Sequence, residues 1–168
     1  MAHARLHDGS GAPARRGRAK KGLPAPEAAA REALGRSRGG LTTKLHAAAD
    51  ALGNPLRLIV TAGQRNDLTQ AAALLDGYTP GAVVADRGYD ADGLLAQIAA
   101  LGAEAVIPPK RSRLVERAYD GNLYADRNKV ERLFNRLKQY RRVATRYEKT
   151  ARNYLAFAQV AAITTLLL

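Results

Sequence analysis

Tyr124-Ala-Asp-Arg127-Asn-Lys-Val-Glu131-Arg-Leu-Phe-Asn-Arg-Leu-Lys138 is the stretch around which the rest of the chain is organised. Its apolar residues recur with helical spacing and predict an amphipathic helix from about 126 to 147. Steps of three, four and seven residues place Tyr124, Arg127, Glu131 and Lys138 on nearly one stripe of that helix. Glu131 then sits at the edge of the buried face, where a metal-binding carboxylate would need to be. The simpler interpretation is a surface helix with an Arg127–Glu131 ion pair.

Length and composition indicate one globular domain with a real core. The chain has 168 residues and no cysteine, which excludes disulfides and thiolate zinc sites. Its longest apolar run, Tyr154 to Leu168, is too short to span a membrane, and the N-terminus lacks the apolar core of a secretion signal. We therefore expect a cytoplasmic protein with no membrane partner.

The net charge of +12 is unevenly distributed. Residues 1–40 carry nine Lys and Arg against three Asp and Glu, and residues 110–168 carry fourteen against five. The middle of the chain is slightly acidic, with four basic residues against seven acidic ones. Two basic ends around an acidic middle indicate a polyanion partner, for which nucleic acid is the obvious candidate. A ribosomal-type RNA binder would share this balance, so charge alone selects no activity.

The order of predicted elements indicates an α/β sheet. Alternation predicts a half-buried strand at 41–49 with His46 on its exposed face, followed after a turn by a second strand at 56–62. The apolar run Gly81-Ala-Val-Val-Ala-Asp86 predicts a central strand with Asp86 at its carboxyl end, where open α/β sheets place functional groups. Further elements are predicted as helices at 68–75, 93–101 and 153–167, a strand at 104–107, and a basic loop at 110–122. Asp90 or Asp92 can cap the helix at 93–101.

Residues 1–40 are rich in Ala, Gly, Arg and Lys, with no lasting apolar periodicity. They predict a mobile, disordered basic arm ahead of a domain at 41–168.

Asp86 and Glu131, if presented towards one point in so basic a chain, suggest magnesium-assisted phosphoryl transfer. Magnesium favours hard oxygen ligands, and basic residues outside the site would hold a phosphate backbone by charge. A Ser/His/Asp or Cys/His nucleophile is not supported, because cysteine is absent and the histidines fall in the arm and on an exposed strand position.

The chain resembles the DDE transposases of bacterial insertion sequences. Four stretches carry the resemblance, which covers about residues 35–168: Gly35-Arg-Ser-Arg-Gly-Gly-Leu-Thr-Thr-Lys-Leu-His46, Leu58-Ile-Val-Thr-Ala-Gly-Gln-Arg-Asn-Asp67, Val84-Ala-Asp86-Arg-Gly-Tyr89-Asp90, and the Tyr, Arg, Glu, Lys pattern quoted first. The last two together are quite specific.

The resemblance implies a ribonuclease-H-like mixed sheet flanked by helices. It implies that Asp86 and Glu131 ligate catalytic Mg²⁺ or Mn²⁺, with no small-molecule cofactor. Tyr124, Arg127 and Lys138 would contact the DNA at the element ends. The partner would be double-stranded DNA, as element ends and target, cut and joined by a protein that associates with the nucleoid when bound. Recognition of paired ends makes a homodimer an expectation from the resemblance alone.

One departure concerns the family's first catalytic Asp, on a strand that should precede a basic Ala-His segment. Met1-Ala-His3 resembles the start of that segment, and Asp8 follows it in a sequence without strand character, so Asp8 is not given the role. The sequence thus predicts an incomplete catalytic domain that lacks its first strand and is inactive alone. The alternative is a DNA-binding transposase fragment that does not cut.

Overall fold

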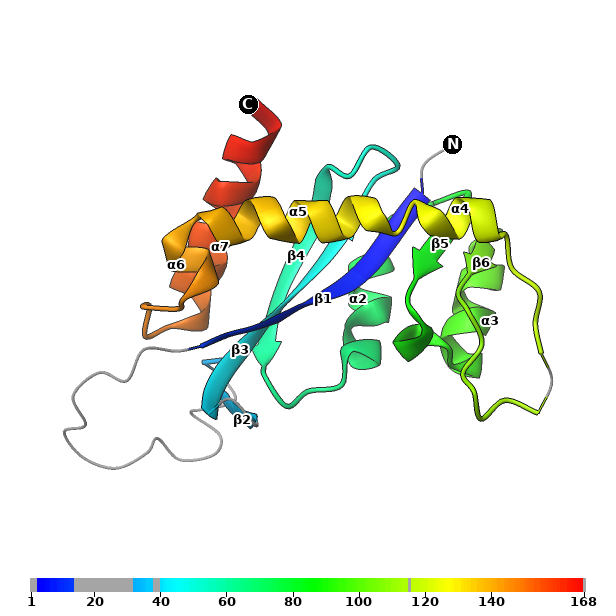
Figure 1. The fold of residues 1–168 in the computed structure, drawn as a ribbon, viewed down its shortest axis with the longest axis horizontal. Coiled ribbons are helices and arrows are strands. Elements are labelled where there is room, and N and C mark those ends of the chain that lie inside the picture. Colours follow the sequence, from blue (N-terminus) through cyan, green and yellow to red (C-terminus); the bar gives the residue numbers. More distant parts are fainter. Residues whose placement is uncertain (1–2, 14–31, 38–39, 115, 168) are drawn as a thin grey trace. The chain divides into compact units, whose positions relative to one another are not determined.

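The computed structural model describes residues 3–13, 32–37, 40–114 and 116–167, and it shows a mixed α/β fold (Figure 1). Six strands form one sheet in the order β2-β3-β1-β5-β6, with β4 also paired to β3. The strands are β1 (His3–Pro13), β2 (Gly35–Ser37), β3 (Gly40–Ala49), β4 (Pro55–Ala62), β5 (Ala82–Ala85) and β6 (Glu104–Val106). The helices are η1 (Asp67–Gln70), α2 (Ala71–Leu75), η2 (Arg87–Tyr89), α3 (Asp92–Ala100), α4 (Gly121–Ala125), α5 (Asn128–Gln139), α6 (Arg141–Ala144) and α7 (Ala151–Leu167).

Strand β1 corrects two expectations. Residues 3–13 and 35–37 form strands, so the prediction of a disordered arm is wrong for them, while 14–31 lie outside the described residues. The sheet as described also has a strand where the first one was expected to be missing. β1 runs parallel to β5, with His3 opposite Ala82 and Leu6 opposite Ala85. Backbone pairing with a buried neighbour can hold a strand whose own sequence shows no alternation. The boundary at residue 40 stays a prediction.

The chain divides into two compact units, each described by itself. The first contains the described residues of 1–7, 47–57 and 66–133. The second contains those of 8–46, 58–65 and 134–168. The ribonuclease-H-like assignment stays a prediction.

The first unit is built on β5, whose four residues are all buried. β6 pairs with β5 in parallel, with Ala82 opposite Glu104. Ala82, Val84 and Val106 form a buried cluster against which α4 packs. This strand was predicted as a central one buried on both faces, and the structure confirms it.

The second unit is built around a buried arginine, Arg146, which is 1% exposed. Its guanidinium donates to the carbonyl oxygens of Glu32 at 2.7 Å, Glu148 at 3.0 Å and Lys149 at 3.1 Å, and to Thr43 Oγ1 at 2.6 Å. These bonds join the segment before β2, strand β3 and the connection from α6 to α7. Burial lowers the pKa of Arg146, although the nearby Glu32 opposes that effect.

Two details of this unit differ from the sequence prediction. His46 is fully buried rather than exposed, and its Nε2 lies 2.7 Å from Thr61 Oγ1 on β4. The helix predicted at 126–147 is divided into α5 and α6, because Tyr140 takes an extended backbone and begins a new helix as its N-cap.

Within the described residues, no helix is long and apolar enough to cross a membrane.

Candidate active site

Asp86 follows β5 directly and begins η2 as its N-cap. Its Oδ1 accepts a hydrogen bond of 2.7 Å from the backbone N–H of Gly88. A Cβ on Gly88 would lie 2.9 Å from the same oxygen, so a larger residue there would displace the Asp86 carboxylate. Asp86 is half-buried, in contrast to the four buried residues before it. The strand therefore ends by presenting a carboxylate at the surface of the first unit, as the sequence predicted.

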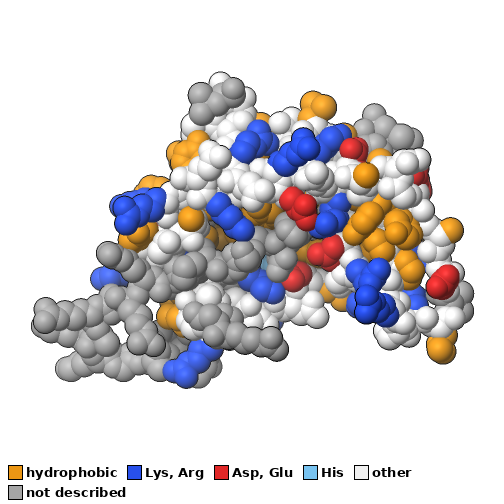
Figure 2. Space-filling view, in the orientation of Figure 1, with side chains coloured by type: hydrophobic (Ala, Val, Ile, Leu, Met, Phe, Trp, Pro, Cys, Tyr) orange, Lys and Arg blue, Asp and Glu red, His pale blue; other side chains and the backbone are white. Residues whose placement is uncertain are grey.

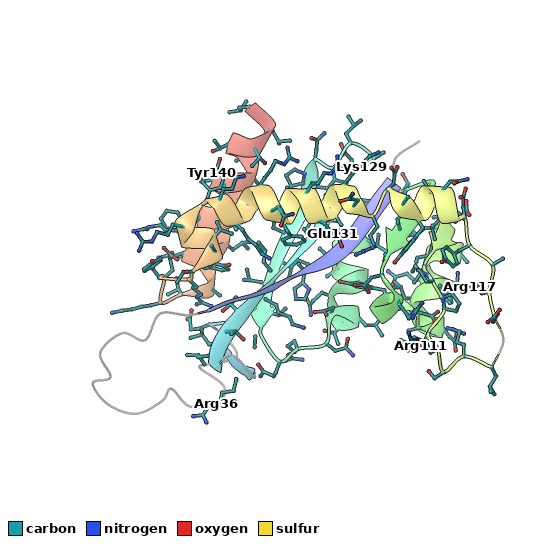
Figure 3. The ribbon with its side chains drawn as sticks, viewed as in Figure 1. Arg36, Arg111, Arg117, Lys129, Glu131 and Tyr140 are labelled. Atoms are coloured by element: carbon teal, nitrogen blue, oxygen red, sulfur yellow. The ribbon has the colours of Figure 1, made fainter. Side chains whose placement is uncertain are left out.

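Glu131 lies on α5, in the part of that helix that belongs to the first unit. Its side chain is 39% exposed, and its Oε1 lies 2.7 Å from an Arg127 guanidinium nitrogen. The ion pair of the simpler interpretation is thus formed. An exposed pair of this kind contributes little to stability, so it does not by itself account for a carboxylate at this position. In Figure 3, Glu131 and Lys129 leave α5 on opposite sides.

Tyr124 lies on α4 and packs against the cluster of Ala82, Val84 and Val106. The Arg127 guanidinium lies 5.7 Å from the centre of its ring, within the range of a cation–π contact. Tyr124 therefore has a structural role beneath β5 in addition to the predicted DNA contact. The Arg127 guanidinium therefore contacts the Tyr124 ring on one side and the Glu131 carboxylate on the other.

The helix expected to begin at about 126 begins as α5 at Asn128, and Tyr124 lies before it on the separate short helix α4. At the division, Arg127 N–H donates to Tyr124 C=O at 2.9 Å and Val130 N–H donates to Arg127 C=O at 3.1 Å. Hydrogen bonds that span three residues are typical of a 3-10 turn, which is wound more tightly than an α-helix. The chain therefore continues from α4 to α5 without regular α-helical geometry. The single stripe predicted from Tyr124 to Lys138 is therefore interrupted after Tyr124.

Lys138 lies seven residues after Glu131 on α5, is exposed, and belongs to the second unit. The structure thus brings together Tyr124, Arg127 and Glu131. The convergence of Asp86 with Glu131 stays a prediction. No group of three or more His, Cys, Asp or Glu residues that could hold a metal ion occurs among the described residues.

Asp90 closes the motif that begins at Asp86, and it is 2% exposed. The sequence predicted that Asp90 or Asp92 caps α3, but the N-cap is Ala91, without a side-chain cap bond. The Asp90 carboxylate instead accepts from Arg113 Nε at 2.6 Å and from Lys110 N–H at 2.7 Å. Burial alone would raise the pKa of Asp90, but these hydrogen bonds outweigh it and lower the pKa below the ordinary value.

The basic loop after β6 is therefore partly structural, which its composition did not reveal. Arg113 also bonds Asp92 at 2.7 Å, and Arg117 donates to the carbonyl oxygens of Ala105 and Ile107. Arg111 remains exposed on the same loop (Figure 3). The only sequence signal for this anchored loop was Asp90, four residues after Asp86, and it was interpreted as a helix cap.

Positive charge dominates the face shown in Figure 2, where Lys and Arg side chains cover more area than Asp and Glu. The net charge of +12 agrees with this distribution. Such a surface attracts polyanions at long range and loses that attraction in salt.

Comparison with known proteins supports the resemblance. The family model described as "Transposase DDE domain" matches residues 3–166. A protein of Brucella ovis, named as a transposase for insertion sequence element IS6501, is 46% identical over 123 residues, which are 72% of this chain and 95% of that protein. A protein of Burkholderia cepacia, named as a transposase for insertion sequence element IS402, is 32% identical over 130 residues, which are 70% of this chain and 59% of that protein.

Proposed function

Because this chain belongs to the family of proteins with a transposase DDE domain, we propose that it cleaves and joins DNA strands during transposition of an insertion sequence. Asp86 and Glu131 would be the acids that ligate Mg²⁺ or Mn²⁺. The observation that carries this proposal is the placement of Asp86. A buried strand ends in a half-exposed carboxylate that accepts a hydrogen bond from the Gly88 backbone N–H, in the same unit as the half-exposed Glu131.

The donor chemistry fits a hard divalent cation. Asp86 Oδ1 accepts from Gly88 N–H and Glu131 Oε1 meets Arg127. Both side chains are carboxylates, whose oxygens are the ligands that a hard divalent cation prefers. Magnesium is usually held by one or two carboxylates together with water and substrate phosphates, which suits a site with two acids. When bound, the metal would stabilise the attacking and leaving oxygens of phosphoryl transfer.

The basic residues near these acids would hold DNA. Arg127 balances the charge of Glu131, and we propose that it turns towards a phosphate when a metal takes its place on the carboxylate. Tyr124 would offer its ring edge next to the DNA backbone. Lys138, exposed on α5, would meet a phosphate as a point charge.

Metal binding tests the two acids whether or not the chain cuts DNA. We expect Asp86→Asn and Glu131→Gln each to weaken Mn²⁺ binding at least about tenfold, because each removes one anionic ligand. The measurement is Mn²⁺ titration followed by electron paramagnetic resonance, with a DNA duplex present. Glu104→Gln, an exposed acid on β6, is the matched control and should leave the affinity unchanged. Equal affinity in all four proteins would contradict the proposed site.

A second candidate is a module that binds DNA without cutting it. It is favoured because no group of three or more His, Cys, Asp or Glu residues that could hold a metal ion occurs among the described residues. We expect the chain alone to bind duplexes carrying the element ends and to produce no strand transfer with Mg²⁺. Strand transfer by this chain alone would eliminate the second candidate.

DNA binding by Lys138 has its own signature. We expect Lys138→Ala to weaken duplex binding and to reduce the slope of log affinity against log salt by about one unit, because one phosphate contact is lost. Fluorescence anisotropy at several salt concentrations measures this slope. Glu104→Gln serves again as the control, and an unchanged slope in Lys138→Ala would remove Lys138 from the interface.

A further inference from the structure

The turn from Lys110 to Arg113 is fastened at both ends to one buried oxygen atom. Arg113 N–H donates to Lys110 C=O at 3.0 Å, which closes a four-residue turn. Asp90 Oδ2 accepts from Lys110 N–H at 2.7 Å and from Arg113 Nε at 2.6 Å. Both ends of the turn therefore meet the same carboxylate oxygen, and the two residues between them, Arg111 and Ser112, form an exposed tip.

Arg117 anchors the loop after this turn. Its Nη1 donates to Ala105 C=O at 3.1 Å and its Nη2 to Ile107 C=O at 2.7 Å, near the end of β6. The same Nη2 lies 3.5 Å from Asp90 Oδ1, so the second carboxylate oxygen also faces an arginine. Arg117 is thus held against the first unit, whereas Arg111 is exposed on the same loop (Figure 3).

Helix η2 connects this anchor to Asp86. Tyr89 N–H donates to Asp86 C=O at 3.0 Å and Asp90 N–H donates to Arg87 C=O at 3.2 Å, so the chain makes a tight turn between the two aspartates. Tyr89 is 1% exposed and Asp90 2%, which fixes this segment in the core. The residues of η2 span only about 6 Å, at about 2.0 Å for each residue of a 3-10 helix. The Lys110–Arg113 turn and Asp86 are therefore joined through a short, hydrogen-bonded segment of the same unit.

A loop that only connects β6 to α4 needs no buried carboxylate beneath it, because burying an ion is costly unless its partners compensate. The partners of Asp90 are the two ends of the turn, and the result is a fixed tip. A side chain displayed on a fixed turn binds its ligand without the entropy loss of ordering the loop. An arginine displayed in this way suits a phosphate group, whose oxygens it can meet with two parallel N–H donors.

We propose that Asp90 is a positioning residue, which holds the Lys110–Arg113 turn so that Arg111 binds a phosphate of the DNA strand presented to Asp86. This inference rests on the proposed function for its ligand, DNA, and adds to it a contact residue and the residue that orients it. Phosphate contacts fix the register of a protein on a duplex. Arg111 would therefore hold the strand in place relative to the carboxylate at the end of β5.

Duplex binding with a chelator present tests this role, because the chelator removes any contribution of the proposed metal site. We expect Arg111→Ala to weaken binding at least about fivefold and to lower the slope of log affinity against log salt by about one unit. Asp90→Asn should weaken binding by a similar factor, although it removes a negative charge and charge alone would strengthen binding. Asp92→Asn is the matched control. It removes the same charge from an exposed side chain that bonds the same Arg113, so binding should stay equal or become tighter.

The double variant separates positioning from a general loss of structure. If Asp90 acts through Arg111, adding Asp90→Asn to Arg111→Ala should weaken binding by less than about twofold further, because the residue that Asp90 positions is already removed. Two independent losses would multiply instead. Fluorescence anisotropy measures the affinities, and circular dichroism in the same buffer checks that each variant is folded. Multiplied losses, an Asp90→Asn chain that binds as tightly as the wild type, or an unchanged salt slope in Arg111→Ala would each overturn the proposal.

Cross-linking tests the tip with Asp90 intact. Because the chain has no cysteine, Ser112→Cys carries a single benzophenone label next to Arg111. We expect irradiation to join this label to a bound duplex. Leu52→Cys, labelled in the same way, is the control and should give little product, since Leu52 is 79% exposed in the turn before β4 of the same unit. A Ser112 label that does not cross-link would overturn the inference. Equal Mn²⁺ affinity in the acid variants would contradict only the metal site, so the two proposals fail separately.

Discussion

The two units place charged side chains in different environments. The second unit buries Arg146, whereas the first leaves Asp86 and Glu131 half-exposed. Arg146 is buried and donates to three backbone carbonyl groups and a hydroxyl at 3.1 Å or less. Asp86 and Glu131 are half-exposed; Asp86 accepts a hydrogen bond from Gly88 N–H, and Glu131 forms an ion pair with Arg127. A buried charge must be fully bonded for the fold to exist, whereas a charge that is to bind a metal must keep oxygens accessible. Burial of the charged group therefore separates the residue that holds the fold from the candidates for chemistry.

Removing Arg146 should give the largest effect. We expect Arg146→Met to lower the free energy of unfolding by about 3–5 kcal/mol, because the carbonyl oxygens of Glu32, Glu148 and Lys149 lose their donor and each unmet group costs about 1–3 kcal/mol. Urea unfolding followed by circular dichroism measures it. Arg141→Met, an exposed arginine on α6, is the control, with a change within about 0.5 kcal/mol. A similar small change for Arg146→Met would show that the buried network does not support the unit.

Asp90 should come next, because it is as buried as Arg146 but anchors only one loop. We expect Asp90→Asn to cost about 2 kcal/mol of unfolding free energy, since a charged acceptor for Arg113 and Lys110 N–H is lost. Asp92→Asn is the control, because Asp92 bonds the same arginine but its side chain is 88% exposed.

The pH dependence of this difference follows from the lowered pKa of Asp90. A carboxyl whose pKa is lowered in the folded state contributes stability above its ordinary value of 3.8 and loses it as the pH falls through the folded pKa. The gap between wild type and Asp90→Asn should therefore close at acid pH. A gap that stayed constant from pH 7 to pH 2.5 would contradict the role of the ionised carboxylate.

Sequence patterns predicted the features that depend on residues close together in the chain. The apolar run ending in Asp86 predicted a buried strand with a carboxylate at its end, and the Arg127–Glu131 spacing predicted their ion pair. Period-two alternation in β3 also predicted the strand, but not that His46 would be buried, since burial depends on what covers the second face. The positions of Asp86 and Glu131 suggested them as a pair of metal-binding acids, and the family resemblance then implied their catalytic role.

Long-range partners were not predictable in the same way. Arg146 meets Glu32 more than one hundred positions earlier in the chain, and nothing in the local sequence distinguishes it from the surface arginines around it. Asp90 was interpreted as a helix cap because the bond to Arg113 crosses twenty-three positions. Strand β1 depends on β5, which supplies pairing that its own composition does not indicate. In each case the stabilising contact joins residues far apart in the chain, and the local spacing of apolar residues does not predict such contacts.

The smallest effect on stability is expected at the two acids proposed to bind metal. Asp86→Asn keeps an oxygen that can accept from Gly88 N–H, and Glu131→Gln loses only a half-exposed ion pair. We therefore expect each to change the free energy of unfolding by less than about 0.5 kcal/mol in metal-free buffer. Urea unfolding with a chelator present measures this, and adding Mn²⁺ should then stabilise the wild type alone, because only its site binds the ion in the folded state. A loss as large as that of Asp90→Asn would place these acids among the residues that hold the fold, and the distinction from Arg146 would no longer apply.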